Sequence, residues 1–432
     1  MKKDQRQIKD QRLINNQARS YAIATQSVFK DVMASGKPAD RVVSAYFRKN
    51  KNMGSSDRRI ISESLYAVFR WWGWLQQMGD PEKMSDWQTI LFIAMHLEKV
   101  EKDPFMMQWK KESGFKEFLS DIATKDIRDK CEILGKELNM QLKLVDLVPS
   151  WIYQSCPLSK ADHANFFNSN QTRPPMHLRI QGDKQKVISA FQGKANLEQS
   201  EYLKSSLTVR NARINLNELE PFKKGAFEVQ DLASQAIGIA TAAKPGERWW
   251  DACCGAGGKT MQLASMMKNK GAITATDIRE WKLDDLKKRA KRGGFHNINA
   301  KGWDGIHAPS KTDFDGVLVD APCSCTGTWR RNPDARWTST GKDIREMAEI
   351  QHKLLRTCAK AVKPGGYLIY ATCSISSEEN EEMIISFITD HPEFKLEAIP
   401  HPLSGEPTNG MIRIWSWEFD CDSMFVARLQ RG

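Results

Sequence analysis

The stretch that decides the fold is Arg248-Trp-Trp-Asp-Ala-Cys-Cys-Gly-Ala-Gly-Gly-Lys-Thr260, in which a short apolar run leads into a glycine-rich turn. The apolar run predicts a buried strand, and residues 259–267 predict the helix that follows it. Gly255, Gly257 and Gly258 allow the backbone of the turn to approach a ligand closely. Because ligands of open α/β sheets bind beyond the carboxyl ends of the strands, the turn is a candidate binding loop.

The alternation of strand and helix continues through residues 231–432. Further strands are predicted at 272–276, 314–320 and 366–370, and helices at 233–243, 281–292 and 343–362. This order indicates an α/β fold with a parallel, doubly wound sheet. Two late strands, 411–415 and 423–428, have no predicted helix between them and suggest an antiparallel hairpin at one sheet edge.

The N-terminal part of the chain has a different pattern. Residues 1–145 predict an all-helical domain, because apolar residues recur at helical spacing, as at Ile61, Leu65, Val68, Phe69, Trp72 and Leu75. Residues 147–175 contain four prolines and look like a boundary. Short strands at 177–180, 207–210 and 226–229, around a helix near 184–192, predict a small α/β subdomain within residues 146–230.

Charge and hydropathy favour a nucleic-acid partner and exclude a membrane span. Lys and Arg number 64 against 53 Asp and Glu, a net charge of +11, and residues 1–50 alone hold 11 against 4. Such an excess is typical of proteins that bind nucleic acid, although a solvated basic surface explains it equally well. A second basic cluster spans residues 287–292. The charged N-terminus leads into no apolar segment, so we expect a cytoplasmic protein.

The nine cysteines predict reduced thiols rather than disulfides or a metal site. Their number is odd, no C-x-x-C pair occurs, and Cys323-x-Cys325 has the wrong spacing for a zinc knuckle. We therefore expect no metal. Four cysteines are interpreted as buried small apolar residues, and the role of Cys325 stays open; the four are Cys131, Cys156, Cys358 and Cys421.

Two aspartates indicate an adenosine-containing cofactor. Asp277 follows the second strand at the position where an acid accepts the hydroxyls of a ribose, or caps the next helix. Asp304, in Gly302-Trp-Asp-Gly305, follows a short third strand and is placed to meet an adenine amino group, or is a turn aspartate. A phosphate-binding P-loop is the alternative for the glycine-rich turn. Gly258-Lys-Thr260 matches its end, but Cys253 occupies the place of its first glycine.

Two further motifs bring cysteines to the same sheet edge. Asp320-Ala-Pro-Cys-Ser-Cys-Thr-Gly327 ends one strand, and Tyr370-Ala-Thr-Cys-Ser374 ends the next. Cys323 and Cys373 therefore follow two parallel strands, beside the expected cofactor loop. Two strand-end thiols at a ligand site indicate covalent catalysis.

These three motifs together resemble those of the Sun/Nol1/Nop2 family of RNA 5-methylcytosine methyltransferases. The resemblance extends through Trp329-Arg-Arg-Asn-Pro-Asp334 and Pro364-Gly-Gly366, and covers about residues 222–431. It implies a Rossmann-like methyltransferase domain that uses S-adenosylmethionine. Asp57-Arg-Arg59 and Leu65-Tyr-Ala-Val-Phe-Arg70 are similar to the helical NusB-like RNA-binding domain of the bacterial small-subunit rRNA members. RNA is the implied partner, with rRNA favoured and tRNA left open; no oligomeric state is implied.

The resemblance also implies roles for individual residues. Cys373 is the nucleophile that attacks C6 of cytosine, Cys323 assists release, and Asp320 binds the base. The implied cofactor-binding residues are Cys253, Cys254, Gly255, Ala256, Gly257, Gly258, Lys259, Asp277, Asp304 and Asp320. The family usually has proline where this chain has Ala256, which makes the loop less rigid.

Two alternatives to this reading stay open. Cys323 is the nucleophile if the chain follows the DNA cytosine methyltransferases, although Cys373 is then unexplained. A non-catalytic RNA-binding or ribosome-assembly factor would keep the fold without the activity.

Overall fold

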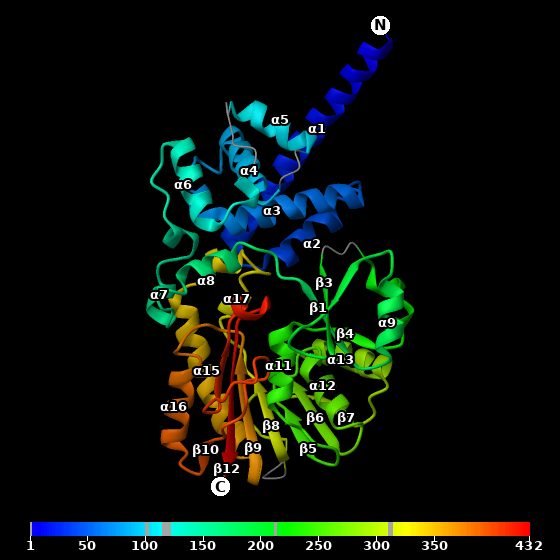
Figure 1. Ribbon diagram of the computed structural model, residues 1–432, viewed down its shortest axis with the longest axis vertical. Coiled ribbons are helices and arrows are strands. Elements are labelled where there is room, and N and C mark those ends of the chain that lie inside the picture. Colours follow the sequence, from blue (N-terminus) through cyan, green and yellow to red (C-terminus); the bar gives the residue numbers. More distant parts are fainter. Residues whose placement is uncertain (1, 100–102, 115–121, 211–213, 310–313) are drawn as a thin grey trace. The chain divides into compact units, whose positions relative to one another are not determined.

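The computed structural model describes residues 2–99, 103–114, 122–210, 214–309 and 314–432, with side chains described from residue 10 onward (Figure 1). The chain forms two compact units. We call residues 1–154, 158–173 and 329–340 the helical unit, and residues 155–157, 174–328 and 341–432 the α/β unit. Among the helices in these described ranges, none is both long enough and apolar enough to cross a membrane.

The helical unit confirms the helical pattern predicted for the N-terminal part. The six apolar positions predicted from their spacing all lie on α3 and are all buried. The elements in and next to this unit are α1 (Lys2–Ser35), α2 (Ala39–Lys49), α3 (Ser55–Leu75), α4 (Met84–Glu98), α5 (Pro104–Ser113), η1 (Ile122–Thr124), α6 (Ile127–Leu138), η2 (Leu144–Leu147), α7 (Ile152–Ser155), α8 (His163–Asn170) and α14 (Ala335–Thr338).

Aromatic side chains make the core of these helices. Phe29 of α1 lies against Phe69 and Trp72 of α3 and Trp87 of α4, with ring centroids 5.2, 4.6 and 5.0 Å away. All four side chains are buried. Aromatic pairs of this kind stabilise a core beyond the area that they bury. At these positions the aromatic residues form the core.

Residues 329–340 are a short insertion that packs with the helical unit. The Arg336 side chain is fully buried, and its guanidinium donates hydrogen bonds to the carbonyl oxygens of Arg70, Leu147 and Asn170. A buried guanidinium requires such acceptors because it cannot lose its charge. One arginine thus joins three segments that are far apart in the sequence.

The two units differ from the three domains expected from the sequence. The proline-rich stretch was expected to end the helical domain at residue 145, but residues 146–154 and 158–173 pack with it. Gly73 on α3 shows why: an added Cβ would lie 1.9 Å from the carbonyl oxygen of Asp146, so η2 contacts the helix directly. The prolines interrupt regular structure here without ending the compact unit. Residues 231–432 were expected to form one domain, but residues 329–340 within this range pack with the helical unit instead.

The predicted small α/β subdomain opens the α/β unit, and its strands form an antiparallel sheet. Its order is β2-β3-β1-β4, and its apolar face covers Val187 and Phe191 of α9. The sequence missed β2, whose residues are mostly exposed and show no apolar alternation. The elements are β1 (Met176–Ile180), α9 (Lys184–Phe191), β2 (Asn196–Gln199), β3 (Ser206–Arg210), η3 (Leu216–Glu218), α10 (Glu220–Lys223) and β4 (Phe227–Val229).

The larger sheet has the order β10-β12-β9-β8-β5-β6-β7, with β11 paired to β12. Strands β7, β6, β5, β8 and β9 are parallel, as predicted. Because β5 lies between β6 and β8, the strand order reverses there, and such a switch point is where doubly wound sheets bind ligands. The strands are β5 (Arg248–Asp251), β6 (Ala272–Asp277), β7 (Ile298–Gly302), β8 (Phe314–Asp320), β9 (Val362–Thr372), β10 (Phe394–Leu396), β11 (Met411–Ile414) and β12 (Met424–Arg431).

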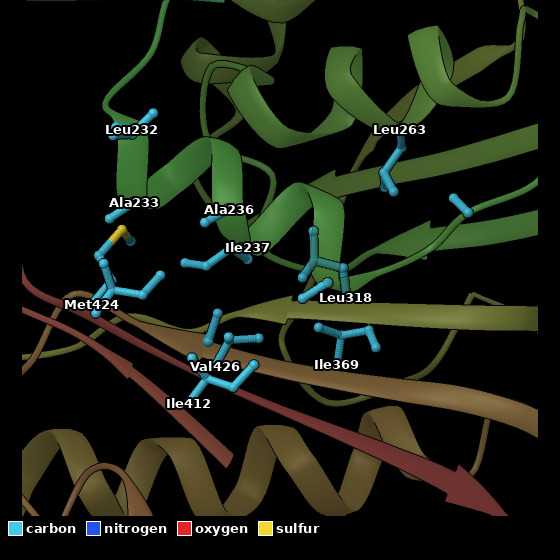
Figure 2. Close-up of a cluster of buried hydrophobic side chains, with 14 of the residues drawn as sticks. Leu232, Ala233, Ala236, Ile237, Leu263, Leu318, Ile369, Ile412, Met424 and Val426 are labelled. Atoms are coloured by element: carbon cyan, nitrogen blue, oxygen red, sulfur yellow. The ribbon is translucent and has the colours of Figure 1, made fainter. Parts of the chain in front are cut away.

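Helices cover both faces of this sheet. On one face, Ala233, Ala236 and Ile237 of α11 pack toward Leu318 of β8 and Val426 of β12 (Figure 2). On the other face, α15 and α16 pack against the same strands. The helices and short turns of this region are α11 (Leu232–Ala240), α12 (Gly258–Met266), α13 (Glu280–Gly293), η4 (Thr326–Thr328), α15 (Gly341–Ala359), α16 (Glu381–Asp390) and α17 (Ser416–Phe419).

The expected C-terminal hairpin is present, with two corrections. β11 and β12 pair antiparallel, and β12 pairs antiparallel with β9. However, the one-turn helix α17 lies between β11 and β12, where no helix was predicted. The three-residue strand β10 also adds to β12. Both elements are too short to produce a periodic pattern.

Candidate active site

The glycine-rich loop after β5 is open toward the carboxyl edge of the sheet. Gly255 and Gly257 have φ of +53° and +83°, which side-chain-bearing residues rarely adopt. A Cβ on Gly257 would lie 2.6 Å from Leu286 of α13, so this glycine allows the loop to pack closely. At Gly255 and Gly258, no atom lies within 4 Å of an added Cβ. The loop therefore presents bare backbone, and the free N–H groups that begin α12, to a ligand.

Arg289 holds this loop from outside. Its guanidinium donates to the carbonyl oxygen of Ala256 at 2.8 Å and forms an ion pair with Glu228 of β4 at 2.9 Å. Glu228 is buried and is also paired with Arg292. Part of the basic cluster at residues 287–292 thus serves an internal contact. This contact fixes the loop at the position where the family usually has proline.

Asp277 joins the ends of β5 and β6. Its carboxylate accepts hydrogen bonds from the backbone N–H of Gly255 at 2.8 Å and from the guanidinium and backbone N–H of Arg279. Burial raises the pKa of Asp277, but the hydrogen bonds and charge of Arg279 outweigh it, and the net pKa lies below its ordinary value. An ionised acceptor therefore stands beside the loop, as a ribose would require.

Asp304 lies at the end of β7, and its carboxylate is engaged in its own turn. It accepts from the backbone N–H groups of Ile306 and His307 and from the His307 ring. These contacts hold the pKa of Asp304 well below its ordinary value. The residue also lines a surface pocket together with Thr276 and Trp303. The structure thus shows the turn contacts that the sequence offered as the alternative to cofactor binding.

Asp251, at the end of β5, is a site residue that the sequence analysis quoted without giving it a role. Its carboxyl group is fully buried and accepts one hydrogen bond from the Thr260 hydroxyl at 2.6 Å. Its second oxygen has no hydrogen-bond partner among the described residues. Burial raises the pKa of Asp251 to about 7. Such a buried acceptor, directly under a ligand loop, fits a site that is completed by a ligand.

An ion pair connects the glycine-rich loop after β5 with the end of β8, just before the loop that carries Cys323. The Lys259 ammonium donates to the Asp320 carboxylate at 2.8 Å. Burial lowers the pKa of Lys259, but the charge and hydrogen bond of Asp320 and the neighbouring Cys373 raise it, and the net shift is upward. Lys259 is therefore a fixed cation at the site.

Cys323 and Cys373 meet at this edge of the sheet, as the two motifs predicted. β8 and β9 are parallel, with Asp320 opposite Ala371, so the residues that follow both strands converge. The two Sγ atoms are 3.4 Å apart. The thiol of Cys325 is the third member of the group, and the three sulfur atoms all lie within 4.8 Å of one another.

The pKa values of both central thiols are raised. For Cys323, the hydrogen bonds with Cys325 and Cys373 contribute most, followed by burial. For Cys373, the hydrogen bond with Cys323 lowers the pKa, but the contact with Cys325, burial and the Asp320 charge together raise it. The thiols are therefore protonated at neutral pH, and attack requires that the proton be removed when substrate is bound.

Glu379, which the sequence analysis missed, connects the two cysteine loops. Its buried carboxylate accepts hydrogen bonds from the backbone N–H and the hydroxyl of Ser324, from the Ser374 hydroxyl, and from the Gln351 amide. Ser324 and Ser374 directly follow Cys323 and Cys373. In sequence, Glu379 lies in the polar run Ser376-Ser-Glu-Glu-Asn380, which resembles the solvent-exposed start of a helix. Only the position six residues after a motif cysteine distinguished it.

The remaining cysteines lie outside this group of thiols, and no cysteine forms a disulfide. Cys156, Cys358 and Cys421 are buried, and Cys131 is half-buried, with its thiol donating to the carbonyl oxygen of Leu142. Cys253 and Cys254 lie in the cofactor loop, where burial raises the pKa of both well above the ordinary value.

Comparisons with known proteins give a consistent result. Residues 239–430 match the family model for the 16S rRNA methyltransferase RsmB/F. The ribosomal RNA small subunit methyltransferase B of Yersinia pseudotuberculosis is 30% identical over 399 residues, which cover 82% of this chain and 90% of the relative.

Two solved structures are also similar. The crystal structure of PH0851 has a TM-score of 0.74 at 25% identity, over 95% of this chain and 99% of that one. NSun6 from Pyrococcus horikoshii, solved with SFG, has a TM-score of 0.54 at 20% identity, over 63% of this chain and 94% of that one. The second likeness shows a shared fold.

Proposed function

The chain belongs to the family of ribosomal RNA small subunit methyltransferase B, and on this premise we propose that it methylates C5 of a cytosine in ribosomal RNA. Methyl transfer to RNA follows from the family. The cytosine, its C5 atom and the covalent mechanism are our proposal. The observation that carries the proposal is the pair of strand-end thiols, 3.4 Å apart, beside the Lys259–Asp320 ion pair.

The cofactor is S-adenosylmethionine, consistent with the methyltransferase family and with the analogue SFG in the Pyrococcus NSun6 structure. When bound, it supplies an electrophilic methyl group on a sulfonium. We assign the glycine-rich loop of residues 253–259 and the Asp277 carboxylate to hold it. The open space above Gly255 and Gly258 and the unpartnered oxygen of Asp251 support this assignment.

The two thiols suit the chemistry of cytosine. C5 is a poor nucleophile, because it belongs to an aromatic ring. Attack of a thiolate on C6 breaks the aromaticity and makes C5 an enamine carbon that accepts a methyl group. We assign this attack to Cys373. Asp320 accepts a hydrogen bond from the amino group of the base, next to N3, where charge develops. Water then takes the C5 proton, the electron pair of the C5–H bond re-forms the C5–C6 double bond, and the bond between C6 and sulfur breaks so that Cys373 leaves as a thiolate. Cys323 assists this release.

A base inside a helix is not accessible to this chemistry. The thiolate and the methyl donor approach the plane of the ring, so the target cytosine must be unstacked, either extruded or in a loop. We place the reaction in the cytoplasm, where reducing conditions keep the thiols reduced. tRNA is the alternative substrate, and a non-catalytic assembly factor is the alternative function. Methylation assays on small-subunit rRNA and tRNA, with labelled S-adenosylmethionine and mapping of the product, distinguish the three.

The division of roles between the thiols is tested with a 5-fluorocytosine substrate, whose fluorine blocks the final elimination. Cys373→Ala should abolish turnover and form no covalent protein–RNA adduct. On ordinary cytosine RNA, Cys323→Ala should still attack and methylate, then stall as an adduct that survives denaturing electrophoresis and is lost when Cys373→Ala is added. Cys131→Ala, which changes a half-buried thiol in the helical unit, is the matched control. Adducts from Cys373→Ala and none from Cys323→Ala would show that the roles are exchanged.

A further inference from the structure

The third thiol of the site has no task in the two-thiol mechanism. Cys325 is exposed, whereas Cys323 and Cys373 are partly buried, so the group of three opens to solvent. All pairs of their sulfur atoms lie within 4.8 Å. Cys325 lies two residues after Cys323 in the same loop, while Cys373 follows the neighbouring strand β9. Three thiols around one point are more than a nucleophile and a release partner require.

The loop holds Cys325 in an unusual backbone conformation. Its φ is +58°, in the left-handed region that favours glycine. Thr328 donates its backbone N–H to the Cys325 carbonyl oxygen at 3.0 Å, and Gly327 donates to the carbonyl oxygen of Cys373 at 2.8 Å. These bonds fix the loop against β9. As a result, the Cys325 sulfur stays near the other two, 3.3 Å from the carbonyl oxygen of Cys323.

The arrangement matches the ligand set of a thiophilic metal ion. Zinc binds cysteine sulfur at about 2.3 Å, which places sulfur atoms about 3.8 Å apart in a tetrahedral site. Cys323 and Cys373 are already at 3.4 Å, and the sulfur pairs that include Cys325 need to close by at most about 1 Å. We propose that Cys323, Cys325 and Cys373 form a binding site for one thiophilic divalent cation such as Zn²⁺, with solvent in the fourth position.

Binding would convert the three thiols to thiolates. One cation binds three sulfur atoms and three protons are released to solvent, which leaves one negative charge on the complex. The Lys259 ammonium, which interacts with Cys373 by charge, is placed to balance it. The spacing of Cys323 and Cys325 argued against a metal site because it shows only two of the three ligands. The third ligand, Cys373, comes from a strand end 48 residues after Cys325.

The cation and the substrate would compete for Cys373. The electron pair that binds the metal is the pair that attacks C6, so a bound cation prevents the covalent step. This inhibition rests on the proposed function, whereas cation binding itself does not. The site would make methyl transfer reversibly sensitive to free thiophilic metal.

Cadmium binding to the full-length protein tests the site. Under argon, with a phosphine reductant present, Cd²⁺ is titrated while the ultraviolet thiolate-to-cadmium absorption band is recorded. Wild type should bind one Cd²⁺ tightly, and Zn²⁺ should displace it. Loss of a residue that only hydrogen-bonds a metal ligand costs about 10–100-fold in metal affinity. Because Cys325→Ser removes a sulfur ligand itself, it should weaken binding at least tenfold. It should also remove about a third of the band, because one of three thiolates is lost. Cys131→Ala is the matched control and should bind as wild type does.

Two further measurements make the test decisive. Cys325→Gly, which relieves the left-handed backbone, should fold and should bind Cd²⁺ as weakly as Cys325→Ser does. Unchanged affinity and band intensity in both variants would overturn the three-thiol site. In the wild type, Cd²⁺ should also block adduct formation with 5-fluorocytosine RNA, and a chelator should restore it. The rate of each variant with Cd²⁺ is compared with its own rate without metal. Inhibition that only a thiol reductant reverses would instead indicate a disulfide and overturn the proposal.

Discussion

At the scale of single residues, Glu379 shows how the two cysteine loops are aligned. Removing its carboxylate takes one acceptor from each of three groups, the Ser324 and Ser374 hydroxyls and the Gln351 amide. They keep only their weaker bonds to Thr326, to each other and to the Pro322 carbonyl oxygen. Each unsatisfied buried group costs about 1–3 kcal/mol. We expect Glu379→Ala to lower kcat at least about tenfold through misplaced thiols, with a smaller change in KM.

Glu379→Gln is the conservative control for this prediction. Burial raises the pKa of Glu379. A glutamine has the same length and still offers one acceptor to Ser324 and Gln351. Its amide N–H₂ can donate to the two serine hydroxyls, which rotate to accept. The glutamine variant should therefore recover most of the rate of adduct formation. A folded Glu379→Ala protein with normal kcat would contradict the positioning role.

Asp251 gives the protein a dependence of stability on pH. Its folded pKa is about 7, whereas the unfolded carboxyl group has a pKa of about 3.9. Between these values the folded chain keeps a proton that the unfolded chain has lost, so the free energy of unfolding falls as the pH rises. Asp251→Asn keeps an acceptor for Thr260 and removes this contribution. Its stability relative to wild type should therefore increase from about pH 4 to about pH 7, as measured by urea unfolding. A difference that does not change with pH would contradict the raised pKa.

At the scale of elements, the regular parts of the fold follow from the sequence, and the irregular connections do not. The strands β5, β6, β8 and β9 were predicted because each is a short stretch rich in apolar or β-branched residues before a turn. Since parallel strands end at one edge, the meeting of Cys323 with Cys373 followed from the topology. Asp251 and Glu379 were missed because their importance lies in burial and in hydrogen bonds to distant residues. Neither property leaves a periodic pattern.

The contact between α13 and the cofactor loop is a second feature that only the structure shows. Arg289 links Glu228 of the small sheet with the Ala256 carbonyl oxygen. Arg289→Met keeps the apolar stem and removes both contacts, and so should loosen the loop. We expect about tenfold weaker binding of S-adenosylmethionine by calorimetry, since a charged hydrogen bond contributes about 1.5 kcal/mol or more. Lys288→Met, on the exposed side of the same helix, is the control. Equal affinities in both variants would show that the loop needs no such anchor.

At the scale of the whole molecule, the chain places its chemistry and its basic charge in different units. The thiols, Lys259 and Asp320 all belong to the α/β unit. The local excess of 11 basic over 4 acidic residues lies in residues 1–50 of the helical unit. Because Phe29, Phe69 and Trp72 are taken up by the core, we expect RNA binding by this unit to come mainly from its charged surface. A charged surface contacts phosphates, whereas exposed aromatic rings stack on bases, and these two kinds of contact respond differently to salt.

Salt dependence therefore tests whether the helical unit holds RNA. The full-length triple variant Arg19→Gln, Arg41→Gln and Lys49→Gln removes three exposed cations of α1 and α2. If all three contact phosphates, the slope of log affinity against log salt should become shallower by about 2–3, since each contact contributes about 0.7–0.9. The matched control changes Lys244, Lys268 and Lys270 to glutamine. These exposed lysines precede β5 and β6, at the sheet edge opposite the thiols. An equal loss of slope in the control would mean that net charge alone attracts the RNA. An unchanged slope in the α1–α2 variant would mean that this basic surface is only solvated.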